Sequence, residues 1–500
     1  MGMNRLYTKI GSERFIFLSK FVRINPANRT MLRNVILLIG LISQTITLYA
    51  QGYEITVDLK GAPENQYIRL AHYYGGTQYI TVDSAQVKQG RMVFRGSEPL
   101  KGGMYMLVFS PSRYYDFLIS GKEPAFSIAA DTTDFVKTVK FKGSPENESL
   151  FNYRRFIVDQ TQKAQGLNQQ LTKTQDKVQQ TQFREQINQL QTEVKKATQG
   201  FVGSNSGSFA AKIIQANQDP ELPTELPKLP SGRVDSSYLI QFYKNHYFDF
   251  IDFSDERMIR TPFLQGRVER YFKDLVYQVA DSIITDADKV LGKAKVNLEV
   301  YRYVLYLISN KYENIDVVGL DGVFVHLAEN HYLKNGSWLD EKQRKRFQDR
   351  VSVLKPLVTG KVFPDLLLYD AEVKPIKIGS HSGDYKFLIF YSPDCSHCKE
   401  SAPKIVKFNQ EFGKNRKIAV YMISTDIDAG KWSNFIKTYQ TNSLINVWDA
   451  KRQVDFLNQF DVYATPTTYI LDSANRIIAK RLPVEDFARF IEFYERNKKK

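Results

Sequence analysis

The only two cysteines of this 500-residue chain are Cys395 and Cys398, with two residues between them. Residues 385–391 before them (YKFLIFY) are a run of aromatic and β-branched residues without a breaker, which predicts a buried strand. After a turn, apolar residues at helical spacing over 399–412 predict a helix that begins at the cysteines. The amides and dipole of a helix N-terminus stabilise a thiolate, and a three-residue step permits a disulfide. The pattern predicts a redox-active dithiol in which Cys395 attacks and Cys398 resolves.

His397 lies between the two cysteines. A protonated imidazole there would favour the thiolate and make the pair more oxidising. The alternative role of His397 is that of a polar residue on the helix surface.

Two other interpretations of the cysteine pair are weaker. A zinc site needs two further ligands, and the chain has no third cysteine. A purely structural disulfide would close a very short loop and restrain the unfolded chain little.

Three further motifs accompany the pair. Gly360–Leu366 (GKVFPDL) precedes it, Pro403 follows the second cysteine by five residues, and Ala464–Thr468 (ATPTT) leads into short strands near 469–479. These motifs resemble the thioredoxin fold, and more closely its extracytoplasmic TlpA/ResA-like branch, over roughly residues 358–497. In that family they are the entry segment, the kink of the active-site helix and the loop that carries a cis-proline.

The resemblance implies an α/β thioredoxin fold for residues 358–500 and thiol–disulfide oxidoreductase activity without a cofactor. It also implies that Thr465 and Pro466 bind substrate, with Pro466 in the uncommon cis form and packed against the cysteines. The chain departs from the family at three positions. Ile389 stands where thioredoxins bury a carboxylate, Asp394 replaces a tryptophan, and Ser401 stands where ResA-like proteins often have glutamate. The group that moves the proton is therefore left open.

Two more domains are expected upstream. Residues 53–145 contain short, often alternating apolar runs between glycine and proline turns, which predicts an all-β sandwich. Residues 233–357 are expected to form an all-α domain. Both segments resemble domains of unknown function that precede thioredoxin-like domains in Bacteroidetes proteins. The expected architecture is therefore multidomain: an N-terminal all-β sandwich, a middle all-α domain and a C-terminal α/β thioredoxin fold.

Residues 146–232 connect these two domains as a glutamine-rich helical segment followed by a proline-rich linker at 220–232. Alternating four- and three-residue steps between apolar residues form a heptad seam at Phe183, Ile187, Leu190, Val194 and Ala197. The seam predicts an intramolecular helix pair. Dimerisation through a coiled coil over residues 152–197 is the alternative that stays open.

A second group of chemical interest is His326 with Glu329 and His331. Its spacing is not that of the HExxH metal motif, and a five-residue step puts the two histidines on different sides of an α-helix. We therefore expect a partly buried polar face here and no metal site.

The formal net charge is +15, but part of the surplus lies in the first 34 residues and the rest is spread along the chain. No stripe of basic residues interleaved with aromatic ones indicates a nucleic-acid partner. The expected partners are cysteine-containing envelope proteins as substrates and a membrane or periplasmic redox protein.

Export is expected from residues 1–50. A basic stretch ending in Arg33 precedes the apolar run Val35–Ala50, which resembles a secretory signal with cleavage after Ala50; translation starting at Met31 would give it an ordinary length. An uncleaved segment that anchors the protein in the inner membrane is the alternative. The protein is therefore expected in the periplasm.

Together these features predict an exported thiol–disulfide oxidoreductase. A rival interpretation is a non-enzymatic envelope binding or assembly protein whose thioredoxin domain is incidental, and the missing carboxylate at Ile389 favours it. The direction of electron flow cannot be read from the residues, because it depends on the reduction potential.

The signal predicts the N-terminus of the mature protein. Cleavage should leave a chain that starts near Gln51 and stays in the soluble periplasmic fraction, because the apolar segment is then removed. N-terminal sequencing of protein from the native host measures this. Recovery of residues 35–50 in the membrane fraction would instead support the anchored form.

Overall fold

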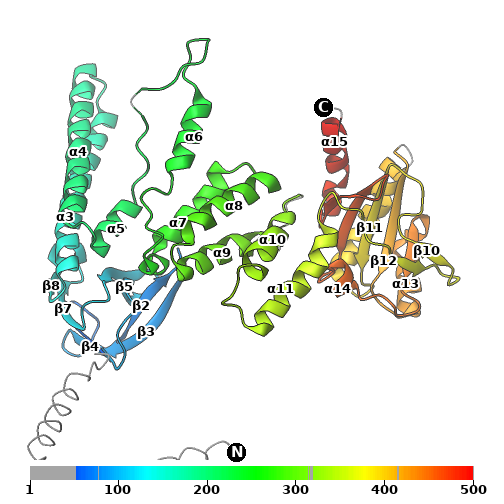
Figure 1. The fold of residues 1–500 in the computed structure, drawn as a ribbon, viewed down its shortest axis with the longest axis horizontal. Helices are drawn as coiled ribbons and strands as arrows, with labels where there is room; N and C mark the ends of the chain where they lie inside the picture. Colours follow the sequence, from blue (N-terminus) through cyan, green and yellow to red (C-terminus); the bar gives the residue numbers. More distant parts are fainter. Residues whose placement is uncertain are drawn as a thin grey trace, which may run out of the picture.

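The computed structural model describes residues 52–76, 78–223, 225–313, 315, 319–413 and 416–498. The expected signal segment and membrane anchor, within residues 1–50, lie outside this range. Among the described residues, no helix is long and apolar enough to cross a membrane. Figure 1 shows the β-sandwich and the helical region side by side, with the C-terminal domain beyond helix α11. The predicted multidomain architecture is thus confirmed.

The N-terminal domain is a sandwich of two four-stranded sheets, with strand orders β4-β1-β7-β8 and β3-β2-β5-β6. Their inner faces share one apolar cluster, as the alternating sequence predicts. The strands are β1 Tyr53–Lys60, β2 Tyr67–Tyr74, β3 Gln78–Gln86, β4 Arg91–Gly96, β5 Gly103–Ser110, β6 Arg113–Ile119, β7 Ala125–Asp131 and β8 Lys140–Lys142; a short helix, α2 Phe135–Thr138, precedes β8.

The middle region is helical. Its helices are α3 Pro145–Lys173, α4 Lys177–Ser204, α5 Phe209–Ala216, α6 Ser236–His246, α7 Pro262–Arg270, α8 Ala280–Ala294, α9 Leu298–Glu313, α10 Gly322–Leu327 and α11 Glu341–Leu354, with a π-helical turn, η4 Ala328–Leu333, directly after α10. Helices α3 and α4 form a long hairpin, seen at the left of Figure 1. The heptad seam of α4 is half-buried in this pair, and Tyr153 of α3 bonds Thr198 of α4 at 2.9 Å. The predicted intramolecular pair is therefore present.

The sandwich packs directly on the helical region. Met104 of β5 and Leu118 of β6 belong to the apolar cluster of the helices. Arg257 donates to the Ser120 carbonyl at 3.0 Å, and Arg260 donates to the Gly102 carbonyl at 2.5 Å. A Cβ at Gly102 would lie 2.5 Å from the Arg257 side chain, so only glycine permits this approach.

The C-terminal domain is a seven-stranded sheet of order β10-β9-β13-β12-β11-β14-β15. Strand β11 is parallel to β12 and antiparallel to β14. The strands are β9 Leu367–Tyr369, β10 Pro375–Lys377, β11 Tyr385–Tyr391, β12 Ile418–Ser424, β13 Ile445–Trp448, β14 Thr467–Asp472 and β15 Ile477–Lys480; the helices are α12 Ser396–Phe408, α13 Ala429–Tyr439, α14 Phe456–Phe460 and α15 Phe487–Lys498. The predicted strand at 385–391 is confirmed at both ends.

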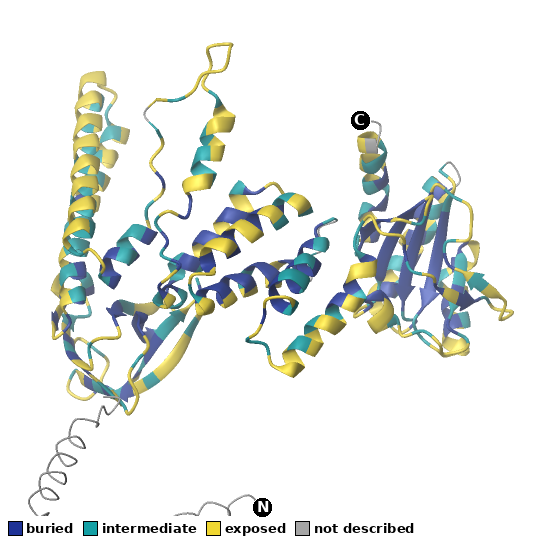
Figure 2. Cartoon of the chain, in the orientation of Figure 1, coloured by how far each residue is buried: buried dark blue, intermediate teal, exposed yellow. Residues whose placement is uncertain are grey.

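Strand β11 is buried on both faces, and Figure 2 shows the strands around it in the colour of buried residues. Alternate residues point to opposite faces. Phe387 and Ile389 therefore pack in the cluster that α12, α13 and α15 complete, and Leu388 and Phe390 pack in the cluster that includes α14. A strand covered on both faces is mostly apolar, which explains why its sequence does not alternate. The exception is Lys386, which is 3% exposed and donates to the Ser473 carbonyl at 3.1 Å.

Buried ion pairs join the helical region to the C-terminal domain. Asp321, at the start of α10, bonds Lys480 of β15 at 2.8 Å, and both side chains are at most 9% exposed. Asp461, after α14, pairs with Arg350 of α11 at 2.5 Å and with Arg481 at 2.6 Å. These contacts fix the orientation of α11 against the sheet.

Substitution of Asp321 by alanine should destabilise the protein by about 3–5 kcal/mol, because it leaves the Lys480 ammonium buried without its partner. Chemical unfolding followed by tryptophan fluorescence measures this. As a control, Asp365→Ala removes the partner of Lys377 from an exposed pair and should cost less than about 1 kcal/mol. Equal losses in the two variants would contradict a buried, structural pair.

Candidate active site

The cysteine pair lies where β11 ends and α12 begins. Cys395 is the N-cap residue of α12, and its Sγ accepts a hydrogen bond from the Cys398 amide at 3.4 Å. The first amides of a helix have no partner within the helix, so a sulfur at this position receives N–H groups that point at it. Pro403 lies inside α12, where the sequence analysis expected the kink of the active-site helix.

The Cys395 thiol is partly exposed and acidified. Partial burial alone would raise its pKa. Hydrogen bonds with the side chains of Cys398 and Thr465 and with the amides of Cys398 and His397 outweigh burial and lower the pKa below the usual thiol value. Cys395 is therefore the more reactive thiol of the pair on chemical grounds.

Cys398 has the opposite surroundings. Its side chain is only 2% exposed and packs with Ile389 on one face of the sheet. Burial and its hydrogen bond with Cys395 raise the pKa of Cys398. No carboxylate lies at Ile389 to take a proton, so Cys398 stays a protonated thiol until Cys395 has reacted.

Tyr391 is a residue of the site that the sequence analysis missed. It lies two residues after Ile389, on the same face of β11, and packs with Cys398 and Trp432. Burial raises the pKa of its hydroxyl, and a negative charge on Cys398 would raise it further. The hydroxyl therefore stays protonated, and the Tyr391 side chain lies in the same apolar cluster as that cysteine. Counting in steps of two along the strand from Ile389 would have found it.

The loop before β14 comes to lie beside Cys395 from 70 residues away in the sequence. The Thr465–Pro466 peptide bond is cis, as the sequence analysis expected, and the Cys395 thiol donates to the Thr465 carbonyl at 3.1 Å. Thr467 closes the loop with a bond to the Ala464 carbonyl at 2.6 Å. The loop thus presents backbone to the space around Cys395.

Hollows flank this loop on both sides. One has a volume of about 530 Å³ and is lined by Pro466, Ser401 and Arg481 among others. A second, of about 630 Å³, is lined by Thr465, Ser392 and Phe456 among others. Tyr463 and Ala464 border both hollows. An extended peptide can therefore cross the loop next to the cysteine.

The ring of His397 is exposed, and its Nδ1 lies 4.0 Å from Glu400 Oε2 on the helix surface. It is the amide of His397, rather than its ring, that contributes to the low pKa of Cys395.

Beside the pair, Asp394 forms an exposed ion pair with Lys431 of α13 at 2.5 Å, which lowers the pKa of Asp394. The sequence analysis noted Asp394 only as a departure from the family and did not identify this partner.

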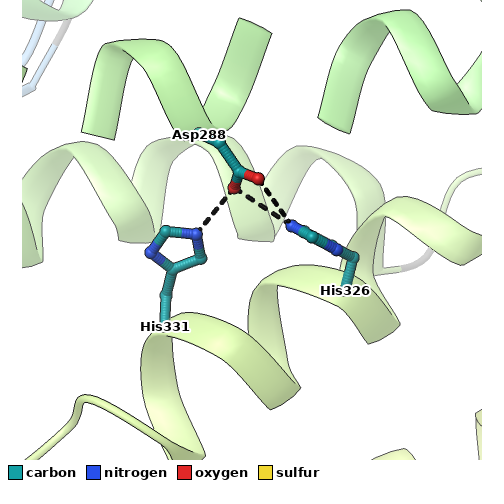
Figure 3. Close-up of side chains that lie close together, drawn as sticks. All are labelled: Asp288, His326 and His331. Carbon is teal, nitrogen blue, oxygen red and sulfur yellow. Dashed lines mark hydrogen bonds and ion pairs between the residues drawn. The ribbon is translucent and has the colours of Figure 1, made fainter. Parts of the chain in front are cut away.

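One part of the expectation for the second histidine group is wrong, namely where the two rings lie; the group is polar and partly buried, as expected. His326 and His331 do not lie on different sides of a helix, because both contact Asp288 of α8 (Figure 3). Within the described part of the chain, these three residues form the one cluster with the donor atoms for a metal ion. The cause is the π-helical turn η4, which the expected α-helix did not include.

Family models match three parts of the chain. Residues 383–477 match a thioredoxin-like family, residues 53–150 match one domain of unknown function (DUF4369), and residues 162–356 match another (DUF5106). None of the curated proteins matches the chain.

Solved structures of bacterial proteins are similar to parts of the chain. A thioredoxin-like protein from Bacteroides caccae is 20% identical, with 55% of this chain and 99% of that one covered and a TM-score of 0.45. A domain of a possible thiol-disulfide isomerase from Cytophaga hutchinsonii is 31% identical, with 29% and 97% covered and a TM-score of 0.28. The thioredoxin domain of a thiol-disulfide oxidoreductase from Bacteroides vulgatus is 25% identical, with 27% and 97% covered and a TM-score of 0.26.

Iodoacetamide should modify Cys395 before Cys398 in the reduced, folded chain, because only Cys395 is both accessible and acidified. Its alkylation rate should reach half of its maximum at a pH below about 8.5, the value of an unperturbed thiol. Mass spectrometry of samples quenched across a pH series measures both. In denaturant the two cysteines should react alike. Preferential labelling of Cys398 in the folded chain would reverse the assigned roles.

Proposed function

We propose that this chain, which belongs to the multidomain thioredoxin-like proteins, is an exported thiol–disulfide oxidoreductase that exchanges disulfides with envelope proteins. The observation that carries the proposal is the position of Cys395, which caps α12 and lies 3.1 Å from the carbonyl of the cis-proline loop. A cysteine with a purely structural role does not require a lowered pKa, access to solvent or a neighbouring stretch of exposed backbone, and Cys395 has all three.

The exchange proceeds in two displacements. The Cys395 thiolate attacks one sulfur of a substrate disulfide, a mixed disulfide forms, and the other substrate sulfur leaves as a thiolate that takes up a proton. The Cys398 sulfur, after losing its proton, then attacks Sγ of Cys395 and releases the second substrate thiol. Two electrons pass to the substrate, and the pair ends as a disulfide. The same steps reversed oxidise a dithiol, so the reduction potentials of the two partners set the direction.

The raised pKa of Cys398 makes its deprotonation the demanding part of the second displacement. Ile389 cannot accept that proton. The substrate thiolate released in the first displacement, or water entering beside the loop, supplies the acceptor in this scheme.

The hollows beside Thr465 and Pro466 support a cysteine-containing peptide as substrate. An extended segment adds its backbone to an exposed edge while its side chains enter flanking pockets. Cysteine-containing envelope proteins fit this role, and a membrane or periplasmic redox protein would return the pair to its starting state. The signal-like segment before Gln51 supports export.

The Cys398→Ser variant should accumulate long-lived mixed disulfides through Cys395, because the resolving sulfur is absent. Non-reducing electrophoresis after incubation with an oxidised cysteine-containing protein measures them, and added dithiothreitol should release them. The matched Cys395→Ser variant keeps one thiol in the same site but should form no adduct and should fall to the uncatalysed rate in an insulin-reduction assay.

The reduction potential of the purified wild-type chain separates this function from a non-enzymatic binding or assembly role. Thioredoxin-like catalysts lie between about −270 and −120 mV and equilibrate rapidly. Two results together would support the non-enzymatic binding role that Ile389 favours. The cysteine pair would exchange disulfides no faster than glutathione alone, and the Cys398→Ser variant would trap no mixed disulfide.

A further inference from the structure

Three donor side chains of the helical region converge far from the cysteine pair. Asp288 comes from α8, His326 from α10 and His331 from η4. His331 Nε2 lies 2.8 Å from Asp288 Oδ1, and His326 Nε2 lies 3.0 and 3.1 Å from the two carboxylate oxygens. Figure 3 shows both rings with an edge nitrogen turned toward the same carboxylate.

The π-helical turn makes this convergence possible. In an α-helix a five-residue step separates two side chains by about 140° around the axis. Residues 328–333 are instead π-helical, and the Lys334 amide bonds the Glu329 carbonyl five residues earlier at 3.1 Å. Such hydrogen bonds bring residues five apart onto one face, and π-turns of this kind recur at functional sites. The rings of His326 and His331 are consequently 6.2 Å apart.

The donor set is one that binds zinc. Two imidazole nitrogens and a carboxylate oxygen are ordinary Zn²⁺ ligands, at about 2.0–2.2 Å from the metal in a tetrahedral site. Ligand atoms in such a site are about 3.3 Å from one another. The three candidate atoms here all lie within 4.8 Å of one another, with two contacts near 3 Å. Small side-chain shifts therefore suffice to admit the ion.

One outer contact also fits a metal site. Ligating histidines characteristically bond an oxygen through the other ring nitrogen, which fixes the ring. The Nδ1 atom of His331 lies 2.7 Å from the Tyr301 hydroxyl in a buried position. His326 has no such oxygen among the described residues, because the Asn330 atom 3.3 Å from its Nδ1 is the amide nitrogen, which donates to the His326 backbone carbonyl at 3.0 Å. The His331 ring is thus oriented from outside the cluster.

Exposure differs across the cluster. The His331 side chain is 8% exposed, whereas that of Asp288 is 45% exposed. One side of the site is therefore enclosed by the helices, and the other opens to solvent. Three protein ligands leave a fourth position for water.

We propose that Asp288, His326 and His331 bind a zinc ion that links α8 to the α10–η4 segment. The ion cross-links two segments separated by 38 residues, and water completes its coordination. The site lies in the helical domain of unknown function and is independent of the redox function proposed above. Without the ion, the same atoms form a hydrogen-bond network, which is the alternative that the experiment must distinguish.

The test uses the full chain with the Cys395–Cys398 disulfide formed, because free thiols would themselves bind zinc. Competition with a chromophoric chelator should give one Zn²⁺ per chain, and Co²⁺ in its place should show the visible absorption of a tetrahedral ion. Asp288→Asn keeps the shape and the hydrogen-bond acceptor but removes the charged ligand. This variant and His326→Ala should each weaken zinc binding at least tenfold.

His246→Ala is the matched control. It removes a histidine that also contacts an aspartate, Asp249 at 2.6 Å, but lies outside the cluster, so zinc binding should be unchanged. Zinc should raise the melting temperature of the wild-type chain and of His246→Ala, but not of Asp288→Asn, since only binding to the folded state stabilises it. Absence of a zinc stoichiometry near one, or equal affinity in Asp288→Asn and wild type, would leave a hydrogen-bond network and overturn the proposal.

Discussion

The free amide groups at the start of α12 are the constraint on which the redox site depends. A helix must satisfy its first N–H groups with some acceptor, and here the acceptor is the sulfur of Cys395. The partial positive charge of the helix end favours an anionic acceptor over a neutral one. The need to cap a helix and the need for a reactive thiolate are therefore met by one atom. Strand β11, buried on both faces, holds that atom in place because it cannot move without opening both apolar clusters.

Two cysteines three residues apart acquire different chemistry from this arrangement. The first is at the end of the helix, receives hydrogen bonds and reaches solvent. The second is one turn further in, faces Ile389 and is excluded from water. Burial raises the pKa of Cys398, while hydrogen bonds lower that of Cys395 despite its partial burial. The replacement of the usual carboxylate by Ile389 strengthens this contrast, because it removes a polar group from beneath the second sulfur.

The upstream domains are joined to the site by charge rather than by apolar packing alone. Asp461 lies at the start of the segment that leads to the cis-proline loop, is almost fully buried, and is held by Arg350 of α11 and by Arg481. Buried ion pairs contribute little net stability because desolvation offsets their attraction. They do penalise any rearrangement that separates the charges. The loop beside Cys395 and the last helix of the middle region are therefore held in one relative position.

The local part of the site was predictable because it depends on neighbouring residues. A mostly apolar strand of seven residues, a turn and a cysteine at a helix start lie within about 30 positions, and hydrophobic periodicity indicates such features directly. Tyr391 is equally local, but no motif marks it; only its position two residues after Ile389, on the same face of the strand, relates it to the cysteines. The cis Thr465–Pro466 bond was expected through a family resemblance. No sequence spacing predicts that Thr465 lies beside Cys395. The contact arises because β11 and β14 are neighbours in the sheet.

The sequence by itself determined the three kinds of domain, the strand β11 and the capped dithiol, since composition, alternation and helix-start signals act over short distances. Tertiary structure alone decided which distant charges meet. It paired Asp461 with Arg350, and it brought Asp288 to His326 and His331. The second case also required a π-turn, which hydrophobic periodicity does not reveal because the pattern is read at 3.6 residues per turn. The packing of α8 against α10 then supplied the carboxylate that no local pattern could locate.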